Sequence, residues 1–111
     1  MPFPVSSGLL DACVLAVLSR DDAYGYRLTQ ELNRAVDLSD STLYPVLRRL
    51  QKENLLTTYE RAYDGRNRRY YRITREGLKK HAEYTAAWKV FKQNIDKIIF
   101  GEDLHEQSGL H

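Results

Sequence analysis

The residues of this chain that could do chemistry are basic, and they gather in one stretch. Residues 48–80 hold eleven lysines and arginines but four acidic residues, a net charge of +7, whereas residues 1–47 carry −3 and residues 81–111 carry −2. The 111 residues together have a net charge of only +2. Positive charge concentrated in this way suits a polyanion, and nucleic acid is the commonest one. The alternative is a solvated basic surface without a partner.

One predicted helix in this stretch presents a polar, basic face. Apolar residues at helical spacing predict a helix from about Ser41 to Asn54. Its expected buried stripe is Leu43, Val46, Leu47 and Leu50. The residues left exposed are Ser41, Tyr44, Pro45, Arg48, Arg49 and Lys52. Hydroxyl groups near a helix N-terminus can donate to phosphate, and arginine can hold phosphate or read guanine. This face is a candidate DNA-reading surface, with an ordinary solvated helix as the alternative.

The start of this helix carries two further signals. Ser39, Asp40, Ser41 and Thr42 supply N-cap oxygens in a row. Pro45 lacks a backbone N–H and is harmless only near the first turn of a helix. The sequence therefore predicts a helix that begins close to Ser41 or bends near Pro45.

A predicted β-hairpin carries a second basic cluster. Residues 55–63 and 68–73 are rich in β-branched and aromatic residues, which favours two strands, and residues 64–67 are typical of a turn. The cluster consists of Arg66, Asn67, Arg68 and Arg69. Like charges this close repel, so the fold gains nothing from them without a partner. Arginines at a hairpin tip fit a DNA minor groove or its flanking phosphates. Solubility better explains three neighbouring bases, namely Arg61, Arg72 and Arg75.

The elements that must position these residues predict the fold. Two helices are expected before the basic stretch, from about Gly8 to Ser19 and from about Tyr24 to Ala35. The first should turn inward Leu9, Leu10, Cys13, Val14, Val17 and Leu18. Three helices followed by a hairpin is the winged form of the helix-turn-helix. We therefore expect a mainly α fold with a small β-hairpin, in which residues 1–73 form a winged-helix DNA-binding domain.

A long helix is predicted from about Thr74 to Ile99, with Thr74 able to cap its start and Gly101 its end. Apolar residues recur along it at steps of four and three, which is a heptad seam. The seam is Tyr84, Trp88, Phe91, Ile95 and Ile98. We expect residues 74–100 to form a dimerisation helix and residues 101–111 a mobile tail.

No set of residues predicts an enzyme or a metal site. The motifs of zinc proteases, serine hydrolases, P-loop proteins and dinucleotide-binding folds are absent. Cys13 lies among apolar residues and is expected to be a small core residue. We expect no catalysis, no cofactor and no metal. The single cysteine and the lack of a secretion signal or a membrane-length apolar run favour a cytoplasmic protein with no membrane partner.

Three sequence blocks carry a family resemblance. They are YGYRL at 24–28, LSDSTLYPVLRRL at 38–50 and RYYRITREG at 69–77, with Asn54-Leu55-Leu56 between the last two. Together they resemble the PadR family of bacterial transcriptional regulators over roughly residues 9–100. The short C-terminal region resembles the small subfamily, which has a single long dimerising helix.

The resemblance implies a homodimeric repressor that binds a palindromic operator in double-stranded DNA. It implies that Ser41, Thr42 and Tyr44 approach DNA, and that Tyr24 and Tyr26 lie near its backbone. For Tyr26, packing in the core is the alternative. Base choice would rest on Ser41, Thr42, Arg48 and Lys52.

Trp88 has two interpretations. A tryptophan on a heptad seam is commonly dimer core, whereas similar drug-sensing members carry a tryptophan there that stacks on flat aromatic ligands. A small aromatic ligand that releases DNA is therefore a candidate partner, with Asp11 and Ala12 facing its pocket and Phe91 as a wall. A separate alternative for the whole chain is an adaptor that binds proteins and not DNA, although such modules usually lose the basic wing.

Overall fold

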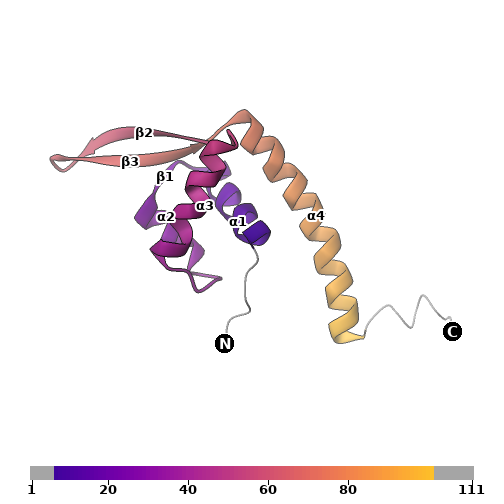
Figure 1. The fold of residues 1–111 in the computed structure, drawn as a ribbon. Coiled ribbons are helices and arrows are strands. Elements are labelled where there is room, and N and C mark those ends of the chain that lie inside the picture. The colour runs from indigo at the N-terminus through magenta and orange to yellow at the C-terminus, as the bar shows by residue number, and fades with distance from the viewer. Residues whose placement is uncertain (1–6, 102–111) are drawn as a thin grey trace. The chain divides into compact units, whose positions relative to one another are not determined.

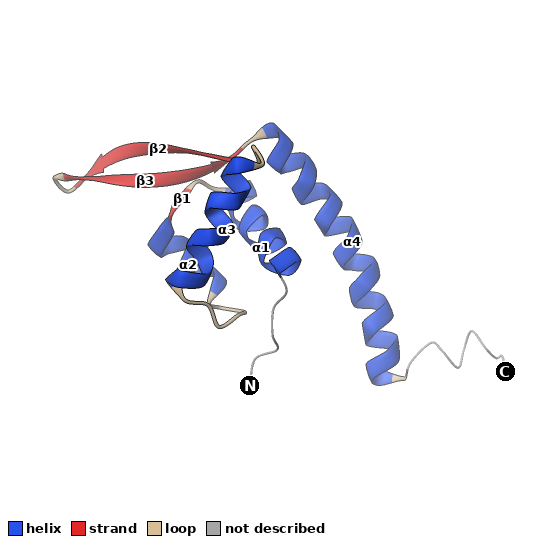
Figure 2. Cartoon of the chain, viewed as in Figure 1, coloured by secondary structure: helices blue, strands red, loops and turns tan. Residues whose placement is uncertain are grey.

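The computed structural model describes residues 7–101, which form helices and a three-stranded antiparallel sheet (Figures 1 and 2). In chain order the elements are α1 (Ser7–Arg20), β1 (Ala23–Tyr24), α2 (Gly25–Leu32), α3 (Asp40–Lys52), β2 (Leu56–Tyr63), β3 (Arg66–Ile73) and α4 (Arg75–Phe100). Three helices followed by a hairpin confirm the winged-helix prediction. No helix among the described residues is both long and apolar enough to cross a membrane.

The chain divides into two compact units, with the boundary between His81 and Ala82 inside α4. The first unit contains α1 to β3 and the start of α4, and the second contains the rest of α4. The sequence predicts this boundary earlier, between residues 73 and 74. Apart from Gly101, the tail predicted at 101–111 lies outside the described residues.

The core of the first unit forms where α1 packs against α2 and α3. The buried side chains of α3 are the predicted Leu43, Val46, Leu47 and Leu50. In α1 the buried apolar residues are Leu10, Val14, Leu15 and Leu18. The prediction for α1 was wrong on one flank, because Leu9, Cys13 and Val17 are only half-buried. A helix that is apolar over a wide face does not indicate which flank meets its neighbours. Burial still raises the pKa of the Cys13 thiol.

The sheet has one strand more than the predicted hairpin. β1 pairs antiparallel with β3 through Ala23 opposite Tyr71 and Tyr24 opposite Tyr70. A strand of two residues is too short for a periodic sequence signal, and for that reason the sequence analysis missed it. The prediction that α2 spans Tyr24 to Ala35 is corrected at both ends. The helix begins at Gly25 and ends at Leu32.

The turn of the hairpin is shorter than predicted. It contains only Asp64 and Gly65, and Arg66 and Asn67 are the first residues of β3. The backbone φ angles of Asp64 and Gly65 are +52° and +78°. Two consecutive positive φ values make the mirror-image type I′ turn, which joins strands through two residues because its twist matches theirs. In Figure 1 the hairpin of β2 and β3 extends beyond β1 as an arm.

The starts of α3 and α4 follow the predicted capping residues. Ser39 is the N-cap of α3, where its carbonyl accepts from the backbone N–H groups of Thr42 and Leu43, but its side chain does not cap the helix. The helix begins next to the predicted Ser41, and Pro45 lies inside it. At α4 the hydroxyl of Thr74 accepts from the backbone N–H of Gly77 at 3.0 Å, which confirms the predicted cap.

Candidate nucleic-acid interface

The exposed face of α3 carries the residues that the sequence predicted for DNA contact. Ser41, Thr42, Tyr44, Arg48 and Lys52 are all exposed. The Ser39 hydroxyl lies 2.9 Å from that of Ser41 and 3.2 Å from that of Thr42. The N-terminal end of α3 therefore presents a cluster of hydroxyl groups at the positive end of the helix dipole, a setting that suits phosphate.

Arg49 differs from its neighbour Arg48, although the sequence analysis placed both on the exposed face. Its guanidinium donates to the carboxylate of Asp11 on α1 and to that of Glu53. The Asp11 residue is only 6% exposed. Hydrogen bonding to Asp11, opposed in part by burial, raises the pKa of Arg49. Arg49 thus ties α3 to α1, and Arg48 has no ion pair within residues 7–101.

A groove of about 480 Å³ runs between the start of α2, α3 and β3. Its lining residues are Tyr24, Gly25, Tyr26, Tyr44, Arg48, Gln51, Arg68, Arg69 and Tyr71. It therefore brings together residues from all three blocks of the sequence. Gln51 was not among the predicted site residues, because nothing in its local pattern separates it from other polar positions.

Two tyrosines shape the groove. Tyr26 is 63% exposed, so of its two interpretations the structure supports the surface position and not the core. Tyr44 lies over Gly25, where an added Cβ atom would come within 2.5 Å of the Tyr44 hydroxyl oxygen. A residue larger than glycine at this position would displace that hydroxyl. The close approach explains why glycine opens α2.

The hairpin of β2 and β3, which we call the wing, has two different faces. Side chains alternate along a strand, so Arg68 and Arg69 point to opposite faces of the sheet. The Arg69 side chain is 61% exposed, and its nearest carboxylate, on Glu60, is 4.0 Å away. The Arg68 guanidinium lies 3.8 Å from the ring centre of Tyr63 and 4.2 Å from that of Tyr24.

Two further arginines on the Arg68 face contact tyrosine rings as well. Arg61 lies over Tyr70, and Arg72 over Tyr59, with the guanidinium carbons 5.7 and 4.6 Å from the ring centres. Asp22 accepts hydrogen bonds from the Tyr59 hydroxyl at 2.8 Å and from Arg72 at 3.1 Å. The bond to Asp22, with burial, raises the pKa of Tyr59.

Within the described residues of the first unit, some basic side chains pair with carboxylates, and others do not. Arg49 and Arg72 pair with carboxylates, whereas Arg48, Lys52 and Arg66 form no ion pair in the described part of the chain. Arg48 lines the groove, Lys52 is the last residue of α3, and Arg66 is the first residue of β3 beside the wing turn. This arrangement is the electrostatic footprint expected of a surface that binds DNA phosphates.

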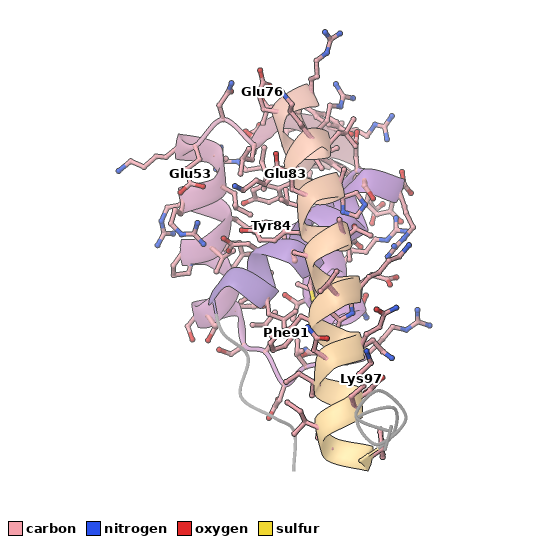
Figure 3. The ribbon with its side chains drawn as sticks, turned by 90° about the vertical axis from the view of Figure 1, so that its right-hand side faces the viewer. Glu53, Glu76, Glu83, Tyr84, Phe91 and Lys97 are labelled. Carbon is pink, nitrogen blue, oxygen red and sulfur yellow. The ribbon has the colours of Figure 1, made fainter. Side chains whose placement is uncertain are left out.

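The second unit exposes much of the predicted seam. Trp88 is 44% and Ile98 67% exposed, Phe91 is exposed, and Tyr84 and Ile95 are half-buried. The ring centres of Trp88 and Phe91 are 6.0 Å apart. Figure 3 shows Tyr84 and Phe91 one heptad apart on the same side of α4. Further large apolar side chains of this helix are exposed, namely Val90, Ile99 and Phe100.

The candidate ligand residues differ in what they can offer. The Asp11 carboxylate already accepts from Arg49, and Ala12 is half-buried. The Trp88 ring retains a large exposed surface. The residues that the structure describes contain no group of histidine, cysteine and carboxylate side chains that could hold a metal ion.

Comparisons with known proteins agree with this geometry. The sequence model of the PadR-like family of transcriptional regulators matches residues 14–83. A Streptococcus mutans protein of known crystal structure is 39% identical with a TM-score of 0.86, and the match covers 95% of this chain and 99% of that one. A PadR-like transcriptional regulator from Bacillus cereus is 34% identical with a TM-score of 0.79, covering 86% and 95%.

A curated relative extends the comparison. The transcriptional regulator Rv3488 of Mycobacterium tuberculosis is 47% identical over 58 residues, which cover 51% of this chain and 54% of that protein. Members of this family are DNA-binding transcriptional regulators and not enzymes. The winged-helix fold, the basic groove and these matches lead to one conclusion: the chain belongs to the PadR-like family of transcriptional regulators.

Proposed function

We propose that this chain is a homodimeric repressor that binds a palindromic operator in the cytoplasm. The observation that carries the proposal is the groove between α3 and the wing, where Arg48 and Arg69 lie beside Tyr26 and Tyr44. In this proposal α3 enters the major groove of DNA, and the wing contacts the adjoining minor groove or its phosphates.

The proposed DNA-contacting residues fall into two groups, those that position the protein on the duplex and those that recognise bases. Hydroxyl groups and lysine or arginine side chains at phosphates set the register of the protein on the duplex, and side chains at base edges supply specificity. Tyr24, Tyr26, Tyr44, Arg66 and Arg69 are assigned to the phosphates. The side chains assigned to base edges are Ser41, Thr42, Arg48, Lys52 and, at the wing, Asn67. Arg48 has the length and the donors to bond the N7 and O6 atoms of guanine.

Dimerisation would follow from the exposed seam of α4. A helix with large apolar side chains at heptad spacing is stabilised when a second copy covers them. A two-fold dimer would place two α3 helices about 34 Å apart, one helical turn of DNA. Replacing Trp88 with alanine should then weaken the dimer by about 3 kcal/mol if the ring is buried between subunits. Sedimentation of the variant measures this, and a variant that remains fully dimeric would assign Trp88 to a ligand pocket.

The proposal also includes release of the DNA when a small ligand binds. The exposed Trp88 ring could stack on a flat aromatic molecule. Such a ligand would change the separation or tilt of the two DNA-binding heads, by no more than its difference in affinity for the two states. Titration of Trp88 fluorescence with planar aromatic compounds tests this part on its own.

The decisive experiment is selection of bound duplexes from random DNA by the full chain, followed by gel shifts over a range of salt. We expect a two-fold symmetric site and an affinity that falls steeply as salt rises. Enrichment without symmetry would remove the dimeric operator from the proposal. If the protein binds no duplex at low salt and instead captures a protein partner, the adaptor alternative replaces it.

A further inference from the structure

We propose that Arg68 is a positioning residue that holds the wing in place, and that its neighbour Arg69 contacts DNA. This inference rests on the proposed function, because it assigns different roles to two arginines of the same DNA-binding wing. By residue type alone, the two arginines are equivalent members of one basic cluster.

The position of Arg68 links the wing tip to the body of the first unit. Tyr63 is the last residue of β2 and lies next to the turn, whereas Tyr24 belongs to β1 and is the N-cap residue of α2. The Arg68 guanidinium lies close to both rings, at 3.8 and 4.2 Å from their centres. A cation near the face of a tyrosine ring is attracted by the ring quadrupole. One side chain therefore connects the far end of the hairpin with the start of α2.

The wing needs such a link because little else supports its outer half. β1 pairs only with Tyr70 and Tyr71, so the part of β3 from Arg66 to Arg69 has β2 as its one partner strand. A two-stranded hairpin is marginally stable in water without further packing. The Arg68 contacts supply packing at the point where the sheet narrows to two strands.

Charge explains why tyrosine is the partner here. Arg61 lies directly opposite Arg68 on the neighbouring strand, and like charges in that arrangement destabilise a sheet. Arg61 lies over Tyr70, while Arg68 lies against Tyr24 and Tyr63. The electron-rich faces of the rings offset the repulsion without adding a carboxylate, which would weaken attraction to DNA.

Arg69 has the opposite surroundings. Its side chain is 61% exposed, it points to the other face of the sheet, and its contact with Glu60 is long at 4.0 Å. It lines the groove together with Arg48 and Tyr44. Arg68 also reaches the edge of this groove, but its guanidinium is already against two rings.

The test compares Arg68→Ala with its matched control, Arg69→Ala, in the full chain. Two properties are measured: DNA affinity as a function of salt, and hydrogen exchange of the wing amides without DNA. For Arg69→Ala we expect the salt slope to fall by about one and wing exchange to stay unchanged. For Arg68→Ala we expect affinity to fall roughly three- to tenfold at every salt concentration with an unchanged slope, and faster exchange in residues 60–69.

Tyr63 separates positioning from a general loss of structure. Tyr63→Ala should show part of the effect of Arg68→Ala, because the contact with Tyr24 remains. The double variant should be no worse than Arg68→Ala alone, and Tyr63→Phe should behave as the wild type because it keeps the ring. A lower salt slope for Arg68→Ala, additive effects of Arg68→Ala and Tyr63→Ala, or unchanged wing exchange would overturn the inference. If Arg69→Ala binds DNA as the wild type does, the wing contact in the proposed function is wrong, while the exchange result still decides the role of Arg68.

Discussion

The two regions proposed to contact DNA, α3 and the wing, each contain a pair of consecutive arginines whose side chains point in different directions. On α3, Arg48 is open and Arg49 pairs with Asp11 and Glu53. On the wing, the Arg69 side chain is 61% exposed and 4.0 Å from the Glu60 carboxylate, whereas Arg68 contacts two tyrosine rings. Consecutive residues point about 100° apart on a helix and to opposite faces on a strand. In both regions one arginine thus remains exposed, and the other contacts a neighbouring part of the fold.

The kind of partner differs between the two regions, and the difference follows from burial. The helix packs against α1, so its inner arginine can reach a buried carboxylate and form a link between helices. The outer part of the wing has no such neighbour, and aromatic rings are its packing surface. A buried carboxylate left without a partner is costly, whereas a lost cation–π contact at an exposed site costs little. The helix should therefore be the more sensitive of the two to loss of its inner arginine.

The largest expected effect is on stability, from Arg49→Ala. Removing this side chain leaves the buried Asp11 carboxylate unpaired, and since Arg49 is itself partly exposed we expect a loss of about 2 kcal/mol in the free energy of unfolding. Urea denaturation measures the loss. Arg48→Ala is the matched control and should change stability by less than about 0.5 kcal/mol. Equal effects of the two variants would contradict the division of roles on α3.

The next effect is on DNA binding, from Arg48→Ala. This variant should keep its stability but bind an operator about tenfold more weakly, and its salt slope should fall by about one if Arg48 holds a phosphate. If Arg48 reads guanine instead, the slope should remain and discrimination at one base pair should be lost. Binding assays at several salt concentrations, on wild-type and single-substitution operators, distinguish these results. Unchanged binding to all of them would remove α3 from the interface.

A smaller effect is expected where α3 meets α2. Tyr44→Phe removes one hydroxyl group and should weaken DNA binding by about 1 kcal/mol without unfolding the protein. Gly25→Ala should have a similar effect, because the new methyl group displaces the same hydroxyl. In a Tyr44→Phe background, Gly25→Ala should then cost little more. Independent, additive losses in a gel-shift titration would show that Gly25 acts by another route.

The smallest effect is a pH dependence at the base of the wing. The hydrogen bond to Asp22 requires the protonated phenol of Tyr59, and it therefore raises the pKa of Tyr59 above its ordinary value of 10.0 in the folded protein. The stability that it contributes is present below about pH 10 and is lost as pH rises through the higher folded pKa. The advantage of the wild type over Tyr59→Phe in thermal unfolding should therefore shrink at alkaline pH. A constant difference between the two proteins from pH 8 upward would contradict this.

Much of the fold could be predicted from local sequence patterns. The steps between Leu43, Val46, Leu47 and Leu50 correctly predicted α3 and its buried stripe, and Asp64-Gly65 correctly predicted a hairpin. Local patterns failed where an element was no longer than one period, as in β1, or where a helix was apolar on both flanks, as in α1. They also placed Arg66 and Asn67 in the turn, because residue types alone do not show how few residues a type I′ turn needs.

The candidate site was predictable in composition but not in detail. Net charge and residue types are properties of the chain alone, so the sequence was enough to place an excess of basic residues on α3 and the wing. Whether a given arginine side chain has a partner within the fold depends on residues far along the chain, such as Asp11 for Arg49 and Tyr24 for Arg68. Such pairs form only when the elements pack, and no local pattern encodes them. Only the tertiary structure could therefore divide the basic residues into those that pair with other parts of the fold and those whose side chains stay exposed.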